Sequence, residues 1–470
     1  MGQHQRSTLI EPRQIDTPSM VSDSAMRACA SFGLIPKHTH QKQVKIDPPS
    51  NMLLERIGAS RVVLIVGPSG AGKSCRLRGI ERALCASSLS RVHVVDACFG
   101  PEDSQQPMID LLGGTLESRA ATLAYAGLAE PGLWAMPASC LSVGQRARLA
   151  LAKSMHGARV GDVLIADEFA TPLDRANAYS LAKTMRRWAR QQRVILIAAS
   201  AHEDLEAMLA PDLVIDMNAD IDTDEARSAC PPIDQPIRIE EGTIADYQAL
   251  AHLHYRAPKP ATHTLILRAI RAVPILGEIL AGVLVVSMPT LNGAWRDRAW
   301  PGFFSSGSKS FNANQINTHL RCISRVIVEP RSRGLGVASD LVRAYLRSPQ
   351  TPATEAIAAM GAVCPFFERA GMISYHLPPS PIDLRLLDAL AHTNQSPADL
   401  IESPIEADSL IERELITWSK ARKVIGAGTP DAQTIQKLAP IAACRLLAKP
   451  RAYAHVKHQG DDGDDEEQTR

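Results

Sequence analysis

The sequence predicts an α/β protein: a mainly parallel sheet with helices in the first half, a second α/β unit after it, and a helical region towards the C-terminus. In the first half, apolar β-branched runs alternate with helical segments, which is typical of parallel strands joined by helical crossovers. These runs, between Arg61 and Met217, are RVVLIV, RVHVVDA, DVLIAD, RVILIAA and DLVIDM. At 470 residues, the chain is long enough for two or three domains.

Composition and charge exclude several classes of protein. Hydrophobic residues make up 45% and charged residues 21%, the balance of a globular protein with a sizeable core. The net charge is +1, so no overall basic field draws the chain to nucleic acid or to a membrane. The 9 cysteines include no CxxC pair, which argues against a disulfide framework or a zinc site and favours a reducing, cytoplasmic location. The most apolar stretch, 264–289, is interrupted by charged residues, so no membrane span is expected. Residues 1–14 contain no apolar run, so a signal peptide is not expected.

We expect the chain to divide into six segments. The first, residues 1–50, is a polar lead-in with one short strand at Gln43–Ile46. The others are a first α/β domain (51–220), an acidic linker (221–235), a second α/β domain (236–381), a helical region (382–459) and a disordered acidic tail (460–470).

A motif for binding nucleotide phosphates follows the first strand of the first domain. The segment GPSGAGKS matches GxxxxGK[ST] and lies between an apolar strand (62–66) and a helical segment (75–85), as this motif requires. Its residues are Gly67, Pro68, Ser69, Gly70, Ala71, Gly72, Lys73 and Ser74. The glycines let backbone amides surround phosphate oxygens, Lys73 would reach the β- and γ-phosphates, and Ser74 would ligate Mg²⁺.

Four more motifs accompany the phosphate loop. A second apolar strand (163–166) ends in Asp167, which would hold Mg²⁺ through water, and Glu168, which would polarise the attacking water. The remaining three are LSVGQ at 141–145, TPLD at 171–174, and His202 after the strand RVILIAAS.

Along the chain the five motifs follow one another at 67–74, 141–145, 163–168, 171–174 and 202. In this order they resemble the motifs of the ABC-type ATPases. The resemblance implies that ATP is contacted by the signature residues Ser142, Gly144 and Gln145 and by Asp174, and that His202 contacts the γ-phosphate. It also implies that the signature serine of one subunit completes the phosphate loop of another, so that ATP would be hydrolysed by a homodimer. The lack of a membrane segment favours the members that act on nucleic acid or other macromolecules, and a separate membrane partner stays an alternative.

Three positions of the ATPase resemblance are open or differ from the family. Gln105 and Gln106 are both candidates for the glutamine that senses metal and water. Val143 replaces the first glycine of the family's LSGGQ. Upstream of the phosphate loop the only candidate to stack on adenine is Phe32, so base selectivity is not predicted.

A second phosphate-binding pattern lies in the second domain. The apolar strand 322–328 is followed by Pro330, the segment RGLGVA and an amphipathic helix. This resembles the GNAT acyltransferases, whose motif [QR]xxGx[GA] binds the coenzyme A pyrophosphate. Arg331-x-x-Gly334-x-Gly336 and Arg333-x-x-Gly336-x-Ala338 both fit, and the distance from the proline favours the second. The resemblance implies that acetyl-CoA is bound by Val326, Ile327, Val328, Arg333, Gly334, Leu335, Gly336, Val337 and Ala338, with the strand splayed to accept the pantetheine arm.

The residues for acyl transfer are less well defined. Phe367 occupies the position of the tyrosine that commonly protonates the departing thiolate in this family, and phenylalanine cannot donate a proton. Tyr375 or a water molecule would then serve, or the chemistry is impaired. Glu329 and Ser324 are the candidates to act on the amine, and a solvated loop carboxylate is an equal interpretation of Glu329. Cys364 is interpreted as a packed small residue.

An ABC-type ATPase followed by a GNAT domain resembles a little-characterised prokaryotic family, across roughly residues 50–380. The resemblance implies ATP, Mg²⁺ and acetyl-CoA as ligands. One hypothesis is an ATP-dependent N-acetyltransferase for a macromolecule such as nucleic acid or a protein, with dimer closure as the gate, because acetyl transfer itself needs no ATP. The other is an ATP-switched clamp whose GNAT domain binds coenzyme A without transfer. The basic segment 420–423 is more simply a solvated helix face than a phosphate contact.

Overall fold

A computed structural model describes most of the chain. The described residues are 13–17, 21–31, 34–38, 48–87, 90–202, 204–217, 226–227, 237–254, 260, 262–273, 277–407, 409–426, 428 and 430–456. The strand expected at Gln43–Ile46, the candidate Phe32 and the acidic tail 460–470 lie outside these residues. In the described part of the lead-in, β1 (Arg13–Thr17) pairs in parallel with β2 (Leu34–His38), and α1 (Asp23–Ser31) lies between them in sequence.

The first domain is built on a sheet of six strands, five of them mutually parallel. Across the sheet the order is β4 (Val92–Val94), β5 (Val163–Ala166), β6 (Ile195–Ser200), β3 (Val62–Val66), β7 (Leu213–Asp216) and the antiparallel β8 (Ala226–Arg227). The prediction of a mainly parallel sheet is therefore confirmed. Its strands β3, β5 and β6 are buried because helices cover both faces.

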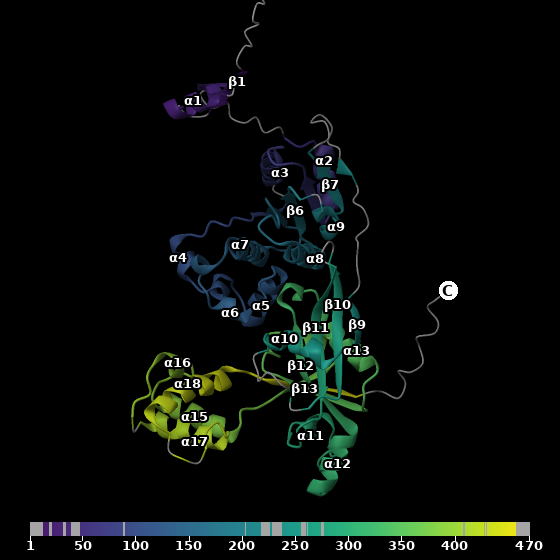
Figure 1. Cartoon of the computed structure of the whole chain (residues 1–470), viewed down its shortest axis with the longest axis vertical. Coiled ribbons are helices and arrows are strands. Elements are labelled where there is room, and N and C mark those ends of the chain that lie inside the picture. The colour runs from purple at the N-terminus through teal and green to yellow at the C-terminus, as the bar shows by residue number, and fades with distance from the viewer. Residues whose placement is uncertain are drawn as a thin grey trace, which may run out of the picture.

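Alternate residues of β3 pack on opposite faces of this sheet. Val62, Leu64 and Val66 join the core formed with α5, α7 and α8. Val63 and Ile65 join the core formed with α2 and α3. The period of two along the strand thus fixes a three-layer arrangement (Figure 1). The helices are α2 (Asn51–Ala59), α3 (Lys73–Ser87), α4 (Pro101–Gln105), α5 (Leu116–Tyr125), α6 (Pro131–Trp134), α7 (Val143–Gly157), α8 (Arg175–Gln192) and α9 (Leu205–Leu209).

The second domain contains a mixed sheet of seven strands. Their spatial order is β14 (Ile373–His376), β15 (Arg451–Val456), β13 (Ala353–Ala358), β12 (Leu320–Val328), β11 (Gly277–Ser287), β10 (Leu265–Val273) and β9 (Arg238–Glu241). Its helices are α10 (Ile244–Ala251), α11 (Arg296–Ala299), α12 (Lys309–His319), α13 (Val337–Arg347) and α14 (Phe366–Arg369), with a 3₁₀ turn η3 (Pro330–Ser332) before α13. α13 and α10 belong to separate core clusters of this domain.

The ladder between β12 and β13 is short. The two strands pair in parallel only from Leu320 and Ala353 to Ile323 and Ala356, although both continue further. On its other side β12 has a register shift against β11, where Val285 lies opposite Arg325 and Val286 opposite Ile323. Ser324 is therefore the extra residue of a β-bulge at the point where the ladder ends.

The C-terminal region forms a helical cluster and then returns to the second sheet. α15 (Pro381–His392), α16 (Asp399–Glu402), α17 (Leu410–Ala421) and α18 (Ala432–Leu447) share a core of their own. β15 follows and lies between β13 and β14. The expectation of a helical region over 382–459 did not include this strand. Among the described residues, no helix combines the length and apolar character needed to cross a membrane.

Asp383 joins two helices of the C-terminal cluster. Its carboxylate accepts hydrogen bonds from Trp418 Nε1 (2.9 Å) and from Arg422. Burial opposes its ionisation, but the hydrogen bonds from Arg422, Trp418 and Ser380 outweigh burial and hold the pKa of Asp383 below its usual value. Because the folded pKa is the lower one, this carboxylate stabilises the fold at neutral pH, and the contribution is lost as pH falls through the folded pKa.

We expect Asp383→Asn to destabilise the helical cluster by about 1–3 kcal/mol at neutral pH, the size of a lost hydrogen bond to a charged group. In acid the difference from the wild type should shrink, because the wild-type carboxyl is then protonated as well. Hydrogen-exchange protection of the α15 and α17 amides measures both effects. Asp388→Asn, an exposed change on the same helix, is the matched control. Equal protection of the two variants at pH 7 would contradict the prediction.

Candidate functional site

The phosphate loop, the acidic pair and the histidine meet at one edge of the first sheet. β3, β6 and β5 are neighbours and parallel, with Val66 opposite Ser200 and Ala166 opposite Ala198. The phosphate loop follows β3, Asp167 follows β5, and the segment with His202 follows β6. Parallel strands end at a common edge, which is where open α/β sheets bind ligands. The fold therefore brings together three motifs that are far apart in the sequence.

The loop after β3 folds around a lysine. Gly70 and Gly72 have φ of 85° and 87°, a conformation that glycine adopts at little cost. Lys73, the first residue of α3, donates from Nζ to the carbonyl oxygens of Gly67 (2.8 Å) and Pro68 (2.9 Å). The ammonium group thus lies within the loop and beside the N-terminus of α3, where the helix also contributes positive potential. This end of the helix fits a group of phosphates.

The acidic pair leaves β5 in a tight turn. Glu168 and Ala170 have φ of 50° and 61°, which non-glycine residues rarely adopt. Asp167 Oδ1 accepts from the amide of Glu168 (3.0 Å), and both side chains are exposed. Successive side chains of a regular strand would point to opposite faces. The turn allows both carboxylates to serve the same edge. With the Ser74 hydroxyl, the Asp167 carboxylate offers the oxygen ligands that Mg²⁺ prefers.

The signature segment forms the start of α7. Ser142 caps the helix: its hydroxyl accepts from the Gln145 amide (3.2 Å), and Gln145 Oε1 accepts from the Ser142 amide (2.9 Å). Val143, in place of the family's glycine, is 66% exposed. A Cβ on Gly144 would lie 3.2 Å from the Pro172 carbonyl oxygen. The signature helix therefore packs closely against the 171–174 segment, with its first turn open to solvent.

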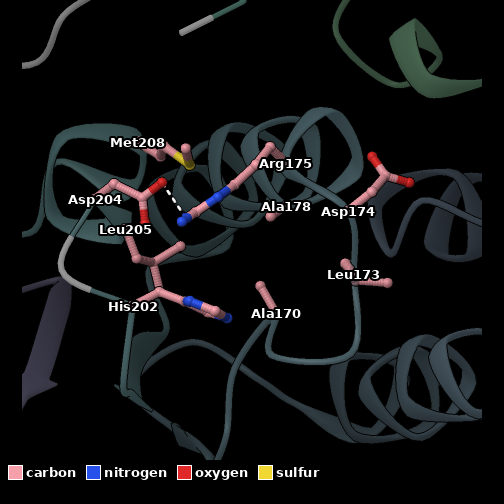
Figure 2. Close-up of a pocket in the computed structure, with 9 residues that line it drawn as sticks. All are labelled: Ala170, Leu173, Asp174, Arg175, Ala178, His202, Asp204, Leu205 and Met208. Atoms are coloured by element: carbon pink, nitrogen blue, oxygen red, sulfur yellow. Dashed lines mark hydrogen bonds and ion pairs between the residues drawn. The ribbon is translucent and has the colours of Figure 1, made fainter. Parts of the chain in front are cut away.

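A pocket of about 130 Å³ separates the 170–178 segment from the segment after β6. Figure 2 shows His202 directed towards Ala170 across it, with Arg175 and Asp204 forming an ion pair at its side. Asp174 points away from the pocket and caps α8 by accepting from the Asn177 amide (3.0 Å). Burial opposes ionisation of Asp174, but the hydrogen bonds from the start of α8 outweigh it and lower its pKa. The Asp174 carboxylate thus serves as the N-cap of α8.

The two candidate glutamines of the first domain lie at its surface. Gln105 ends α4 and Gln106 follows it, and both are exposed. Arg148 of α7 was missed by the sequence reasoning. It donates from Nε to the Gly144 carbonyl (3.2 Å) and from Nη1 to the Gly127 carbonyl (2.7 Å). Arg148 follows Gly144 by four residues, and residues at this spacing share a helix face. This spacing could have indicated that Arg148 lies beside the signature residues.

The second phosphate-binding pattern lies where β12 passes into α13. Gly334 and Gly336 have φ of 78° and 94°, and Gly336 caps the helix. The amides of Val337 and Ala338 lie in the first turn of α13, where N–H groups have no partner within the helix. A Cβ built on Gly336 would lie 3.8 Å from Arg187 Nη1 and from Asp340 Oδ2, at ordinary contact distance. First-turn amides, an 11-residue helix behind them and the missing side chain at Gly336 make this turn a suitable cradle for a phosphate group.

Two charged residues near this turn, Arg333 and Glu329, form hydrogen bonds with other parts of the protein. The Arg333 guanidinium donates to the carbonyl oxygens of Val328 (3.2 Å) and of Ala129 in the first domain (3.1 Å). Glu329 accepts from Arg331 Nε (2.6 Å) and from the Ser332 hydroxyl (3.3 Å). Glu329 lies six positions after Ile323, which is roughly 20 Å of extended strand.

The end of the β12–β13 ladder carries a hydroxyl pair instead. Ser324 Oγ lies 2.6 Å from Ser287 Oγ and within 3.2 Å of the Val285 carbonyl oxygen. Residues 326–328 extend from this point towards the phosphate cradle. Of the two candidates for contact with an amine, Ser324 is therefore the one beside the point where β12 and β13 part.

Phe367 is packed against a tyrosine that the sequence reasoning missed. Its ring centroid lies 4.8 Å from that of Tyr453 on β15. The Tyr453 hydroxyl donates to Glu368 Oε1 (3.3 Å), and burial together with the Glu368 carboxylate raises the pKa of Tyr453. Tyr375 instead stacks with Trp295, 5.9 Å between centroids, in another cluster. Burial also raises the pKa of Cys364, as for a packed thiol.

Comparison with known proteins gives partial likenesses. No protein-family model matches the chain, and no curated protein does. One similar solved structure is cbiO1 from Clostridium perfringens, part of an ABC transporter complex (18% identity, 33% of this chain and 72% of that one, TM-score 0.24). Another is a dimeric ATP-binding cassette in a post-hydrolysis state bound to ADP and phosphate (16% identity, 36% and 86%, TM-score 0.28). A third is a dimeric bacterial ABC transporter cassette (17% identity, 33% and 80%, TM-score 0.25). At these identities and TM-scores the likenesses do not decide the function of this chain.

Proposed function

We propose that this chain couples an ABC-type ATPase to a GNAT-type acyltransferase. It binds and hydrolyses ATP as a homodimer, and the nucleotide state gates transfer of an acetyl group from acetyl-CoA to an amine on a macromolecule. One observation carries the proposal: two helices, α3 and α13, each begin at a glycine-containing strand-to-helix turn of a different sheet. Each turn meets the requirements of a pyrophosphate site.

The ATPase half is supported by the common edge of β3, β6 and β5. There Lys73 would hold the β- and γ-phosphates, Glu168 would polarise the attacking water, and His202 would contact the γ-phosphate. Ser74 and Asp167 would hold Mg²⁺, whose charge neutralises the phosphates when it is bound. The exposed first turn of α7 supports a dimer, because Ser142 and its neighbours face solvent and are accessible to a second copy.

The acyltransferase half is supported by the early end of the β12–β13 ladder. Beyond Ile323 the edge of β12 that faces β13 has no strand partner in the described chain. An extended pantetheine arm can pair with that edge, as a peptide strand would, with its pyrophosphate at the first-turn amides of α13. In the reaction the amine forms a C–N bond to the acetyl carbon and loses a proton, the C–S bond breaks, and the departing thiolate takes up a proton. Ser324 lies where the acetyl group would then sit.

A second function is favoured by the packing of Phe367. Phe367 aligns with the tyrosine that commonly protonates the thiolate in the resembled family, and it packs on the buried Tyr453. A GNAT domain with this packing would bind coenzyme A without transfer, and the chain would act as an ATP-switched clamp. The two functions differ in one measurable product, the free thiol of coenzyme A.

Binding and turnover experiments test the proposal. We expect the wild type to bind coenzyme A in isothermal titration calorimetry, and Gly336→Glu to abolish binding because a carboxylate would occupy the phosphate cradle. The matched control is Gly371→Glu, at an exposed glycine with a similar φ of 96°. Thiol release from acetyl-CoA with tRNA, DNA, polyamines or proteins separates the transferase from the clamp. A wild type that does not bind coenzyme A would refute the acyltransferase half.

A further inference from the structure

One face of α8, in the ATPase domain, lies against the phosphate cradle of the second domain. Ser180, Thr184 and Arg187 are spaced by four and three residues, so they share a helix face. The Ser180 hydroxyl contacts the Arg331 carbonyl oxygen. A Cβ on Gly334 would lie 2.8 Å from the Ala124 carbonyl oxygen and 3.2 Å from Thr184 Cγ2. Only glycine at this position allows so close an approach, and its positive φ adds to that requirement.

Arg187 holds the carbonyl side of the cradle. Its Nη2 donates to the Leu335 carbonyl oxygen (3.0 Å) and its Nη1 to the Gly334 carbonyl oxygen (3.3 Å). In a planar trans peptide the carbonyl and the following N–H point in opposite directions, and the described chain has no cis peptide bond. The amides of Leu335 and Gly336 therefore point away from α8, to the side that a phosphate can reach.

Arg187 also contributes charge to the same place. Its Nη1 and Asp340 Oδ2 are the two atoms nearest to the Cβ that a side chain would have at Gly336, each at 3.8 Å. The Asp340 carboxylate is paired with Arg343, which offsets its negative charge. A guanidinium at that distance favours an anion, and an arginine fork can bridge two acceptors where a lysine ammonium is a point charge.

We propose that Arg187 is a positioning residue for coenzyme A, and that the ATPase domain thereby forms one wall of the coenzyme A phosphate site. α8 is capped by Asp174, the last residue of the segment that packs on the signature helix. A shift of this helix on ATP binding moves Arg187 relative to the cradle. Affinity for coenzyme A then depends on the nucleotide state, and the affinity for ATP depends on coenzyme A by the same factor. This inference rests on the proposed function.

The interface is built so that such a shift costs little. Arg271 of β10 is 1% exposed and donates from Nη1 to Ser180 Oγ (2.8 Å). Its Nε and Nη2 have no hydrogen-bond partner in the described chain. Unpaired donors on a buried guanidinium lower the stability of the docked arrangement. Because the docked arrangement of the two domains is then only marginally stable, ligand binding can shift the equilibrium between it and another arrangement.

The test measures coenzyme A affinity by calorimetry, with and without ATP, in a Glu168→Gln background that blocks hydrolysis. We expect Arg187→Ala to weaken coenzyme A binding about tenfold or more, the loss of charge-assisted hydrogen bonds, and to remove its dependence on ATP. The affinity for ATP alone should be unchanged. Arg187→Lys should recover part of the affinity. Arg190→Ala is the control: Arg190 lies on the same helix and pairs with Asp212 (2.7 Å).

The outcomes separate this inference from the proposed function. If Gly336→Glu abolishes binding but Arg187→Ala binds like the wild type, Arg187 does not position the cradle and the inference is wrong. Tighter binding by Arg187→Ala would also overturn it, because α8 would then cover the site rather than form it. Failure of the wild type to bind coenzyme A would refute the proposed function. Hydrogen exchange over α13 shows whether the variant is folded, so that a binding loss can be assigned to Arg187.

Discussion

Replacing Glu168 with glutamine is expected to slow ATP hydrolysis by about two to four orders of magnitude, the contribution of a general base. ATP binding should persist, because the groups proposed to bind phosphate are Lys73 and the amides at the start of α3, which the substitution leaves in place. Glutamine has nearly the same shape as glutamate, so the left-handed turn at residue 168 is retained. With ATP bound and not consumed, the dimer should accumulate.

Phosphate release measures the first effect and sedimentation velocity the second. Glu117→Gln removes one exposed carboxylate from the first turn of α5 and serves as the control for charge. Hydrolysis at the wild-type rate in Glu168→Gln would show that another group activates the water. A monomer at saturating ATP would contradict a site shared between two copies, while leaving the role of Glu168 intact.

The second large effect concerns a buried ion pair that joins the segment 288–319, between β11 and β12, to β13. Arg296 donates to Glu355 from Nη2 (2.7 Å) and Nε (2.8 Å), and the two side chains are 3% and 2% exposed. Arg296 also donates to the Thr290 carbonyl (2.6 Å). Removing one partner leaves a buried charge without compensation. We expect Arg296→Met to lower the free energy of unfolding of this domain by about 3–5 kcal/mol.

A double variant shows whether the loss comes from the unpaired charge. Arg296→Met combined with Glu355→Leu should recover much of the stability, since an apolar pair can replace a buried ion pair at little net cost. Hydrogen-exchange protection of the β12 and β13 amides is the measurement. Arg298→Met, an exposed change two residues away, is the control. Protection in Arg296→Met equal to that of the control would be inconsistent with the prediction.

The sequence patterns predicted those helices and strands that depend on residues close together in the chain. The strand before the phosphate loop, the helix starting at Lys73 and the apolar strand before Asp167 are encoded by residues within a few positions of one another. β15 was not predicted, because Arg451–Val456 becomes a strand only through pairing with β13 and β14. Its Tyr453, which packs on Phe367, was missed for the same reason. Strand formation of this kind depends on partners distant in sequence.

The contact between the two domains had no signal in the sequence. Arg187 and Arg333 donate to backbone carbonyl groups, and every residue carries such an acceptor. Glu329 shows the opposite problem. Its place just after β12 suggested a role near the acetyl group, whereas pairing with Arg331 and the length of the strand separate it from the point where the β12–β13 ladder ends. The residue type suggested that Glu329 could act as a base, but only the pairing register of β12 shows how far it lies from the end of the β12–β13 ladder.

The late position of β15 has a consequence for biosynthesis. During translation the first sheet can close before the second, because all its strands precede residue 228. The second sheet lacks an inner strand until the four helices of residues 381–447 have emerged. Throughout that interval β13 exposes an unpaired edge of the kind that recruits strands from other chains. A nascent chain stalled before residue 451 would carry a complete first sheet beside a second sheet with one unpaired edge, so we expect it to aggregate more readily than the finished chain.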